Sequence, residues 1–335
     1  MLGSNSETAA LMERVLYEVK RVVVGQDRFL ERVLVAMLSQ GHLLVEGVPG
    51  LAKTLTIKTL AQTLRGQFKR IQFTPDLVPA DLVGTRIYNQ KTGDFSTTLG
   101  PVFTNLLLAD EINRAPAKVQ SALLEVMQER QVTIAGTTHR VPEPFLVMAT
   151  QNPIETEGTY PLPEAQVDRF MMKVLVDYPT EEEEFVIVER VTGAPVEVQP
   201  VATTLQLAQL QQACRGLYVD PSLMQYAVKL VSATRDPARA GLSDLGRYIT
   251  FGASPRATIN LVEGARALAF LRGRTYVLPD DMVDIAADVL RHRLTLSYEA
   301  LAEGISADAI IGKVMQKLPA PDKPLEARAQ LAANG

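Results

Sequence analysis

The sequence predicts an α/β domain with a mostly parallel sheet, followed by a helical domain. Through the first two thirds of the 335 residues, short apolar runs alternate with amphipathic helical segments, which is typical of parallel strands joined by helices. Segment 192–203 then carries Gly193, Pro195 and Pro200, a composition typical of a linker. Beyond it, only helical patterns follow. We therefore expect an α/β domain over residues 1–190 and a helical domain over residues 195–335.

Five apolar runs are the candidate strands of the sheet. They cover residues 42–46, 68–73, 106–109, 145–150 and 171–176. Helical patterns lie between them at residues 54–65, 116–128 and 163–170. Pro116 and Pro163 open the last two helices, and proline suits the first helical turn because its φ angle is already helical.

Two further segments interrupt this alternation. Residues 85–98 have two β-rich arms around a turn at Gly93, and residues 131–141 repeat the pattern around Gly136. A glycine-containing turn between such arms favours a hairpin. We therefore expect two hairpins inserted into the α/β core.

A helix ahead of the linker starts from a capping box formed by Thr180 and Glu183. Further acidic residues lie in its first turn, where the helix dipole favours them. The remaining helical patterns cover residues 205–214, 221–235, 255–272, 279–291 and 307–317.

The overall composition excludes several classes of protein. It is 47% hydrophobic and 21% charged, as is ordinary for a globular protein with a large core. The net charge of −4 argues against broad, sequence-independent nucleic-acid binding. The only cysteine, Cys214, cannot form an internal disulfide. Segment 1–8 lacks a targeting signal, and no apolar run is long enough to insert into a membrane, so we expect a cytoplasmic protein.

The strongest motif is the loop at residues 47–54, GVPGLAKT, between a predicted strand and a predicted helix. A strand, a tight loop and a helix in that order direct backbone N–H groups into one concavity, which binds phosphate oxygens. Lys53 is expected to reach the β- and γ-phosphates of ATP, and the Thr54 hydroxyl to ligate Mg²⁺. The expected nucleotide-binding residues here are Gly47, Val48, Pro49, Gly50, Leu51, Ala52, Lys53, Thr54 and Leu55.

Position 52 departs from the strict phosphate-loop pattern, which has glycine there. We expect residue 52 to enter the helix with a negative φ angle, and a methyl group would then be tolerated.

Two acidic residues, Asp110 and Glu111, follow the apolar run at 106–109. A strand that ends in two acids places both carboxylates at the carboxyl edge of the sheet, where α/β proteins bind ligands. Asp110 is expected to hold Mg²⁺, directly or through water, and Glu111 to orient and polarise the attacking water. Asn152, after the strand at 145–150, is expected beside the γ-phosphate.

Four segments together resemble the MoxR family of AAA+ ATPases: GVPGLAKT, LLLADEINRAPAKVQSALLEVMQER, ATQNPIETEGTYPLPEAQVDRF and GASPRA. The resemblance runs through nearly the whole chain and is most specific over residues 110–170. Ala52 is itself the usual residue in that family's loop. The resemblance implies a five-stranded parallel sheet of order 5-1-4-3-2 with an all-helical C-terminal lid, commonly assembled as a hexameric ring. The two hairpins then correspond to the helix-2 insert and the pre-sensor-1 insert.

The resemblance also implies roles for individual residues. Lys53 and Thr54 fall on Walker A, Asp110 and Glu111 on Walker B, and Asn152 on sensor 1. Arg256, at a predicted helix start in the lid, falls on sensor 2. Arg169 is similar to the arginine finger that reaches a neighbouring subunit's ATP, although Arg114 and Arg130 could also face the neighbour. The segment that lines the adenine corresponds to Val24, Gly25 and Gln26.

Three functions remain open from the sequence. The first is a ring-forming ATPase that remodels or matures client proteins, for which the family suggests von Willebrand factor A domain proteins and metal-cofactor insertion. The second is the motor subunit of a metal chelatase-like or DNA-acting machine. The third is a scaffold that binds ATP and hardly hydrolyses it; the set Glu111, Asn152 and Arg169 argues against this. Tyr88 and Phe95 in the first hairpin could contact a client, or could instead stabilise the hairpin.

Overall fold

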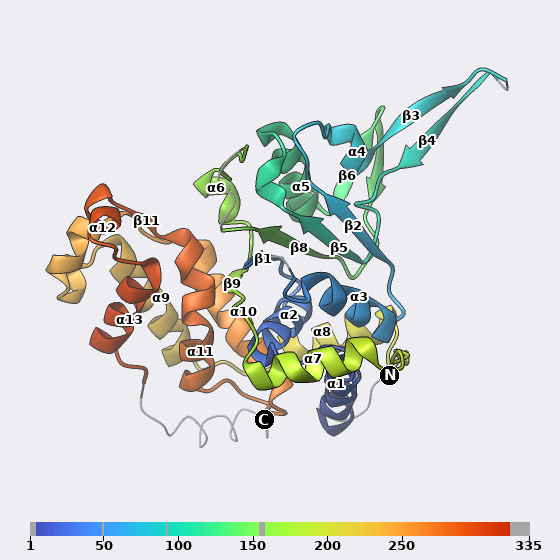
Figure 1. The fold of residues 1–335 in the computed structure, drawn as a ribbon. Helices are drawn as coiled ribbons and strands as arrows, with labels where there is room; N and C mark the ends of the chain where they lie inside the picture. Colours follow the sequence, from blue (N-terminus) through green and yellow to red (C-terminus); the bar gives the residue numbers. More distant parts are fainter. Residues whose placement is uncertain (1–4, 49, 92, 154–157, 322–335) are drawn as a thin grey trace.

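The structure is a computed structural model that describes residues 5–48, 50–91, 93–153 and 158–321. At its centre lies a sheet of five parallel strands in the order β2-β5-β8-β1-β9 (Figure 1). The strands are β1 (Leu43–Glu46), β2 (Phe68–Gln72), β5 (Leu106–Asp110), β8 (Leu146–Gln151) and β9 (Met172–Leu175). Counted along the chain as strands 1 to 5, this is the predicted order 5-1-4-3-2, which is confirmed.

Alternating side chains of the sheet enter two different cores. In β1, Leu43 and Val45 join the core under one face, whereas Leu44 joins the core under the other. Strands β5 and β8 alternate in the same way, as the pleat requires. Helices α1 (Asn5–Lys20), α2 (Asp27–Leu38) and α3 (Lys53–Thr63) cover the first face. Helices α4 (Pro79–Val83) and α5 (Ala117–Glu129) cover the second (Figure 1).

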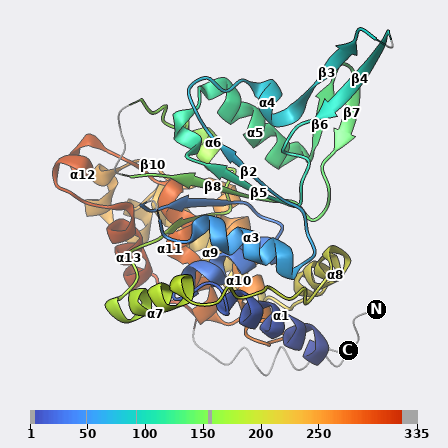
Figure 2. The ribbon, with the colours of Figure 1, turned by 45° about the vertical axis from the view of Figure 1, so that its right-hand side comes forward.

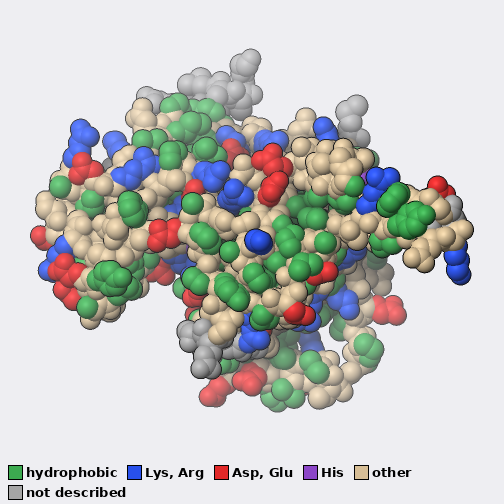
Figure 3. Space-filling model, turned by 90° about the horizontal axis from the view of Figure 1, so that it is seen from above, with side chains coloured by type: hydrophobic (Ala, Val, Ile, Leu, Met, Phe, Trp, Pro, Cys, Tyr) green, Lys and Arg blue, Asp and Glu red, His purple; other side chains and the backbone are tan. Residues whose placement is uncertain are grey.

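Both predicted hairpins are present. Strands β3 (Gly84–Asn89) and β4 (Asp94–Leu99) project from the body, and β6 (Gln131–Ile134) pairs with β7 (Thr137–Arg140). Hydrophobic side chains gather on the projecting β3–β4 hairpin (Figure 3). Tyr88 and Phe95 are direct partners in its register, with ring centroids 4.9 Å apart. The two rings therefore pack on each other and stabilise the hairpin itself.

Two glycines form the root of the β3–β4 hairpin. A Cβ added to Gly84 would lie 2.2 Å from the Thr98 carbonyl oxygen, and one added to Gly100 would lie 2.1 Å from the Leu82 carbonyl oxygen. Gly84 also has a φ of 100°, which favours glycine. The hairpin thus leaves the body through close contact between main chains.

Pro116 and Pro163 were predicted to be the first residues of two helices, but each lies one position before its helix. Helix α5 begins at Ala117 and α6 (Glu164–Val167) begins at Glu164, with Pro116 and Pro163 as extended N-cap residues. The predicted helix over 163–170 is therefore wrong after residue 167. There the backbone carbonyl groups of Asp168 and Phe170 accept hydrogen bonds from the Arg293 side chain instead of continuing a helix.

The C-terminal region is helical, as predicted. Its helices are α7 (Glu181–Thr192), α8 (Thr204–Arg215), α9 (Pro221–Arg235), α10 (Pro255–Leu271), α11 (Pro279–Leu290), α12 (Tyr298–Ala302) and α13 (Ala307–Lys317). The capping box of α7 is confirmed, since Thr180 and Glu183 exchange two hydrogen bonds between side chain and backbone N–H. A short antiparallel pair, β10 (Ile249–Phe251) with β11 (Thr295–Leu296), was not predicted. Within the described ranges, short 3₁₀ helices also lie at Ile112–Arg114, Ala238–Ala240, Ser243–Tyr248 and Arg291–Arg293.

The helical region packs firmly on the α/β part. One apolar core runs from α1 and α2 into α10 and α11. Arg32 of α2 is fully buried, and its guanidinium lies 2.8 Å from Asp288 and 2.7 Å from Asp284 of α11. Such a buried, multiply bonded pair fixes how the two helices lie against each other. In the part of the chain that the structure describes, no helix is both long enough and apolar enough to cross a lipid bilayer.

Candidate active site

The loop between β1 and α3 lies at the carboxyl end of the central sheet. Gly50 and Ala52 both adopt left-handed conformations, with φ angles of 87° and 54°. Helix α3 begins at Lys53, so Lys53 and Thr54 occupy its first turn and Ala52 is its N-cap residue. The expectation of a negative φ at position 52 is wrong, because Ala52 does not enter the helix but precedes it as a left-handed N-cap residue. Pro49, one of the predicted nucleotide-binding residues, lies outside the described residues.

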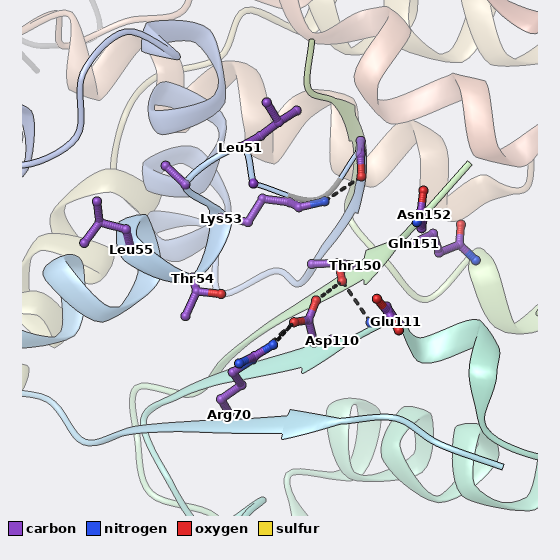
Figure 4. Close-up of a pocket in the computed structure, with 13 residues that line it drawn as sticks. Leu51, Lys53, Thr54, Leu55, Arg70, Asp110, Glu111, Thr150, Gln151 and Asn152 are labelled. Carbon is purple, nitrogen blue, oxygen red and sulfur yellow. Dashed lines mark hydrogen bonds and ion pairs between the residues drawn. The ribbon is translucent and has the colours of Figure 1, made fainter. Parts of the chain in front are cut away.

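A cavity of about 390 Å³ opens between this loop and the ends of β5 and β8 (Figure 4). This volume lies within the range typical of small-molecule sites. Lys53 and Thr54 extend into it from one side, and Asp110 and Glu111 from the other. Among the described residues, the lining is Gly47, Gly50, Leu51, Ala52, Lys53, Thr54, Leu55, Arg70, Asp110, Glu111, Thr150, Gln151 and Asn152. The structure thus brings together two predicted segments that are more than 50 residues apart in the sequence.

Lys53 supplies the positive charge on the loop side of the cavity. Its Nζ donates a hydrogen bond of 2.6 Å to the Gly47 carbonyl oxygen. Burial lowers the pKa of the Lys53 ammonium, and the nearby carboxylates of Asp110 and Glu111 act in the opposite direction. A phosphate entering the cavity would offer this partly buried cation stronger acceptors than one backbone carbonyl.

Both oxygens of the Asp110 carboxylate are hydrogen-bonded. Oδ2 accepts from Arg70 Nη2 at 2.6 Å and from Arg70 Nε at 3.1 Å. Oδ1 accepts from the Thr150 hydroxyl at 2.5 Å. The same hydroxyl oxygen accepts the backbone N–H of Glu111 at 2.9 Å, so Thr150 connects the two acidic positions.

Glu111 has a left-handed backbone, with φ 54°. A β-sheet conformation cannot continue through such a residue, so the chain turns and the carboxylate faces the cavity. Its Oε2 lies 3.0 Å from Arg114 Nε and accepts a hydrogen bond of 2.8 Å from Gln72 Nε2. Asn152 and Gln151 line the same cavity from the end of β8.

Three residues at this site, Arg70, Gln72 and Thr150, were not predicted. Arg70 and Gln72 lie two apart on β2, so their side chains share one face of the sheet. In the strand register, Gln72 is the direct partner of Asp110. Once β2 is known to neighbour β5, polar residues at alternate positions at the end of β2 are the signal for these contacts.

An apolar recess continues from the phosphate loop toward α7, which crosses the molecule below α3 (Figures 1 and 2). Two of the three residues predicted to line the adenine, Val24 and Gln26, are part of it, together with Leu55, Ile187 and Val191. Gln26 Nε2 donates a hydrogen bond of 2.8 Å to the Asp177 carbonyl oxygen. Gly25 lies against the Glu183 carboxylate, where an added Cβ would be only 2.5 Å from Cδ. The apolar walls suit the faces of an aromatic base.

The two predicted arginines, Arg169 and Arg256, line neither the cavity nor the recess. Arg256 lies at the start of α10, with Nη1 3.5 Å from Asp168 Oδ2. Asp168 also binds the Ser254 hydroxyl at 2.9 Å and Arg293 Nε at 2.7 Å. The Arg169 Nε is buried and has no hydrogen-bond partner among the described residues.

The oxygen donors at the cavity fit a magnesium ion. The Thr54 hydroxyl and the Asp110 carboxylate both line it, and Mg²⁺ prefers such oxygen ligands. Among the described residues, no group of three or more His, Cys, Asp and Glu side chains could hold a metal ion. A magnesium ion that keeps few protein ligands and completes its shell with phosphates and water agrees with that arrangement.

Comparison with known proteins places this chain in a family of ATPases. Residues 42–172 match the model of the ATPase family associated with various cellular activities (AAA), and residues 244–314 match the AAA lid domain. The chain is 55% identical to the chaperone MoxR1 of Mycobacterium tuberculosis, over 92% of this chain and 82% of that protein. It is 35% identical to the protein MoxR of Paracoccus denitrificans, over 90% of this chain and 93% of the relative.

A solved structure of another protein has the same fold. The crystal structure of a candidate ATPase from Cytophaga hutchinsonii superposes with a TM-score of 0.90 at 50% sequence identity. The match covers 95% of this chain and 97% of that chain. The similarity therefore extends through the sheet, the cavity and the helical region together.

Proposed function

The chain belongs to the MoxR family of AAA+ ATPases, and from this premise we propose that it hydrolyses ATP, as part of a ring of identical chains, to remodel client proteins. The observation that supports the proposal most is the shared cavity of about 390 Å³. There the cation of Lys53 and the hydroxyl of Thr54 face the carboxylates of Asp110 and Glu111. Phosphoryl transfer requires these elements: positioned positive charge, a metal site and a group that orients water.

Five residues of the cavity, Lys53, Thr54, Asp110, Glu111 and Asn152, have a proposed role in this reaction. Lys53 and the backbone N–H groups of the loop bind the β- and γ-phosphates, and Lys53 leaves the Gly47 carbonyl oxygen to do so. Glu111 accepts a hydrogen bond from the attacking water and polarises it, with Asn152 beside the γ-phosphate. Thr54 and Asp110 hold Mg²⁺, which neutralises charge on the phosphates when it is bound. The apolar recess with Val24 and Gln26 receives the base.

The position of Arg169 supports the proposal of a ring. Because Arg169 lies outside its own chain's cavity, we propose that it completes the cavity of a neighbouring chain as the arginine finger. Arg256 is proposed as sensor 2, which moves from Asp168 toward the nucleotide. We propose a hexamer in the cytoplasm and a helical lid domain over residues 195–335. Mixing Arg169→Ala chains with Lys53→Ala chains tests the finger, because hydrolysis recovers only if Arg169 acts between chains.

The proposed client is a protein. A relative named as a chaperone supports this class, and the family resemblance points to von Willebrand factor A domain proteins and to metal-cofactor insertion. The Glu111→Gln variant is the appropriate bait, because it should hold ATP and client together. Recovery of nucleic acid in place of a protein partner would contradict this assignment.

The catalytic proposal is tested by separating ATP binding from ATP turnover. We expect Lys53→Ala to weaken nucleotide binding about tenfold to hundredfold, since it removes charge-assisted hydrogen bonds to the phosphates. Glu111→Gln should retain binding and lower turnover by about 10²-fold or more. Lys58→Ala, on the exposed face of the same helix, is the matched control and should change neither. Tight binding by the wild-type assembly with only background turnover would instead indicate a nucleotide-gated scaffold.

A further inference from the structure

Arg70 links the edge strand of the sheet to the proposed metal site. Both of its bonding nitrogens, Nη2 and Nε, donate to the same Asp110 oxygen, at 2.6 and 3.1 Å. Its Nη2 also donates to Gln72 Oε1 at 2.9 Å, and Gln72 in turn donates to Glu111. Arg70 is therefore the cation that balances Asp110 in this structure, and it lines the cavity itself (Figure 4).

We propose that Arg70 competes with Mg²⁺ for Asp110, so that the guanidinium occupies the carboxylate in the nucleotide-free chain and must leave it when the metal–nucleotide complex binds. This inference rests on the proposed function, because it concerns the same cavity. Arg70 is then a positioning residue. It orients the Asp110 carboxylate in the nucleotide-free chain, and its competition with the metal sets the magnesium concentration that the site requires.

The two cations cannot use Asp110 in the same way at the same time. Oδ2 accepts two hydrogen bonds from Arg70, so a metal ion or its water can bind that oxygen only after the guanidinium has moved away. Oδ1 accepts one hydrogen bond, from Thr150, and keeps a free lone pair, but a divalent ion bound there would still lie within a few ångströms of the guanidinium charge and repel it. The arrival of one cation therefore weakens the hold of the other.

The Arg70 side chain is also able to leave the Asp110 carboxylate. Its side chain is 49% exposed, and a pair in which one partner is so exposed contributes little stability. Nor is the pair needed to hold β2 in place, because residues 68–72 pair with residues 106–110 along the whole strand through the backbone. If this ion pair served only to join the two strands, it could lie anywhere along them and would not need to face the cavity.

Binding of a fluorescent ADP analogue, titrated with magnesium, tests the competition. ADP is chosen because it lacks the γ-phosphate, so that a contact between Arg70 and that group cannot mask the effect. We expect Arg70→Gln to lower the half-saturating magnesium concentration about threefold to tenfold, in line with the loss of one partly exposed, bidentate ion pair. Arg70→Lys, which keeps the charge without the fork, should give a smaller decrease.

Lys69→Gln is the matched control, because it removes the same charge from the next residue, whose side chain points to the opposite face of the strand. It should leave the magnesium requirement unchanged, and thermal melting should show all variants folded. An unchanged or higher requirement in Arg70→Gln would overturn the inference while leaving the proposed function intact. A wild-type chain that binds no nucleotide at any magnesium concentration would instead overturn the proposed function.

Discussion

Asp110 and Asp168 are equally exposed, at 17% of each side chain, but they are paired in different ways. At the cavity, Asp110 binds Arg70, whose side chain is 49% exposed. At the junction with the helical region, Asp168 binds Arg293, whose side chain is 1% exposed and also donates to the backbone carbonyl groups of Asp168, Phe170 and Met171. The difference between the two regions lies in the arginine: one can return to water at little cost, and the other cannot.

The backbone shows the same contrast. At the cavity, two non-glycine residues, Ala52 and Glu111, hold left-handed conformations that are unfavourable for a residue with a Cβ. At the junction, side-chain donors satisfy the carbonyl groups of the irregular segment 168–171. A replaceable pair and two strained residues thus lie where a ligand is expected to bind, and a buried pair lies where two parts of the chain must stay together.

The largest expected effect comes from removing the buried arginine at the junction between the α/β part and the helical region. We expect Arg293→Ala to lower the free energy of unfolding by about 3–5 kcal/mol, because it leaves buried acceptors without a donor. Arg256→Ala removes an exposed partner of the same Asp168 carboxylate and should cost at most about 1 kcal/mol. Denaturant unfolding of both variants measures the difference. Equal losses would show that burial of the arginine does not distinguish the two pairs.

A pH titration sharpens the comparison at the same junction. Burial, followed by the charge of Arg293, holds the pKa of His292 well below its usual value of 6.5. Its Nε2 bonds to the Phe170 carbonyl oxygen at 3.1 Å, and its Nδ1 has no partner among the described residues. As the pH falls below 6.5, the unfolded chain binds a proton that the folded chain does not, so stability present above that pH is lost. For one such group the loss from pH 7 to pH 5 is about 2 kcal/mol.

His292→Gln keeps a donor for the Phe170 carbonyl and removes this titration. Unfolding at pH 7 and at pH 5 should therefore show a smaller acid loss in the variant than in the wild type, by about the same 2 kcal/mol. An identical loss in both proteins would mean that acid destabilises the molecule elsewhere. His42, whose pKa burial lowers to about 3, would be the next residue to test.

The smallest expected effect concerns strain at the cavity. Ala52→Gly removes the Cβ from a left-handed position, and we expect it to raise the free energy of unfolding by up to about 1 kcal/mol. The control, Ala61→Gly, changes a buried position in the last turn of the same helix and should lower the free energy of unfolding by about 1 kcal/mol. A loss of stability in Ala52→Gly would show that the methyl group makes contacts that outweigh the strain.

The elements and the main site segments could be predicted because their signals are local or belong to the family. Apolar runs indicate the strands, and the loop at 47–54 and the acids at 110 and 111 follow from known chemistry. Arg70, Gln72 and Thr150 were not predicted, because their roles depend on which strands are neighbours rather than on sequence spacing. The conformation of Ala52 was wrongly predicted because residue 52 was expected to enter the helix, whereas it is the N-cap residue just before it.

Contacts between residues far apart in the sequence also explain what was not predicted in the helical region. Strands β10 and β11 are only three and two residues long and are separated by several helices, so no periodicity indicates them. Helix α6 ends before the predicted residue 170, and the carbonyl groups of Asp168 and Phe170 beyond its end accept hydrogen bonds from Arg293, more than 120 residues away in the sequence, a contact that no local pattern indicates.

The root of the β3–β4 hairpin has a consequence for how this protein can diverge. Because Gly84 and Gly100 meet through their main chains, the direction in which the hairpin points is set by atoms that every sequence shares. Its outer residues, including Ile87 and Phe95, are exposed and take no part in that root. Substitutions along the arm can therefore change which surface it would recognise while its reach and orientation stay constant, and this separates the evolution of specificity from that of architecture.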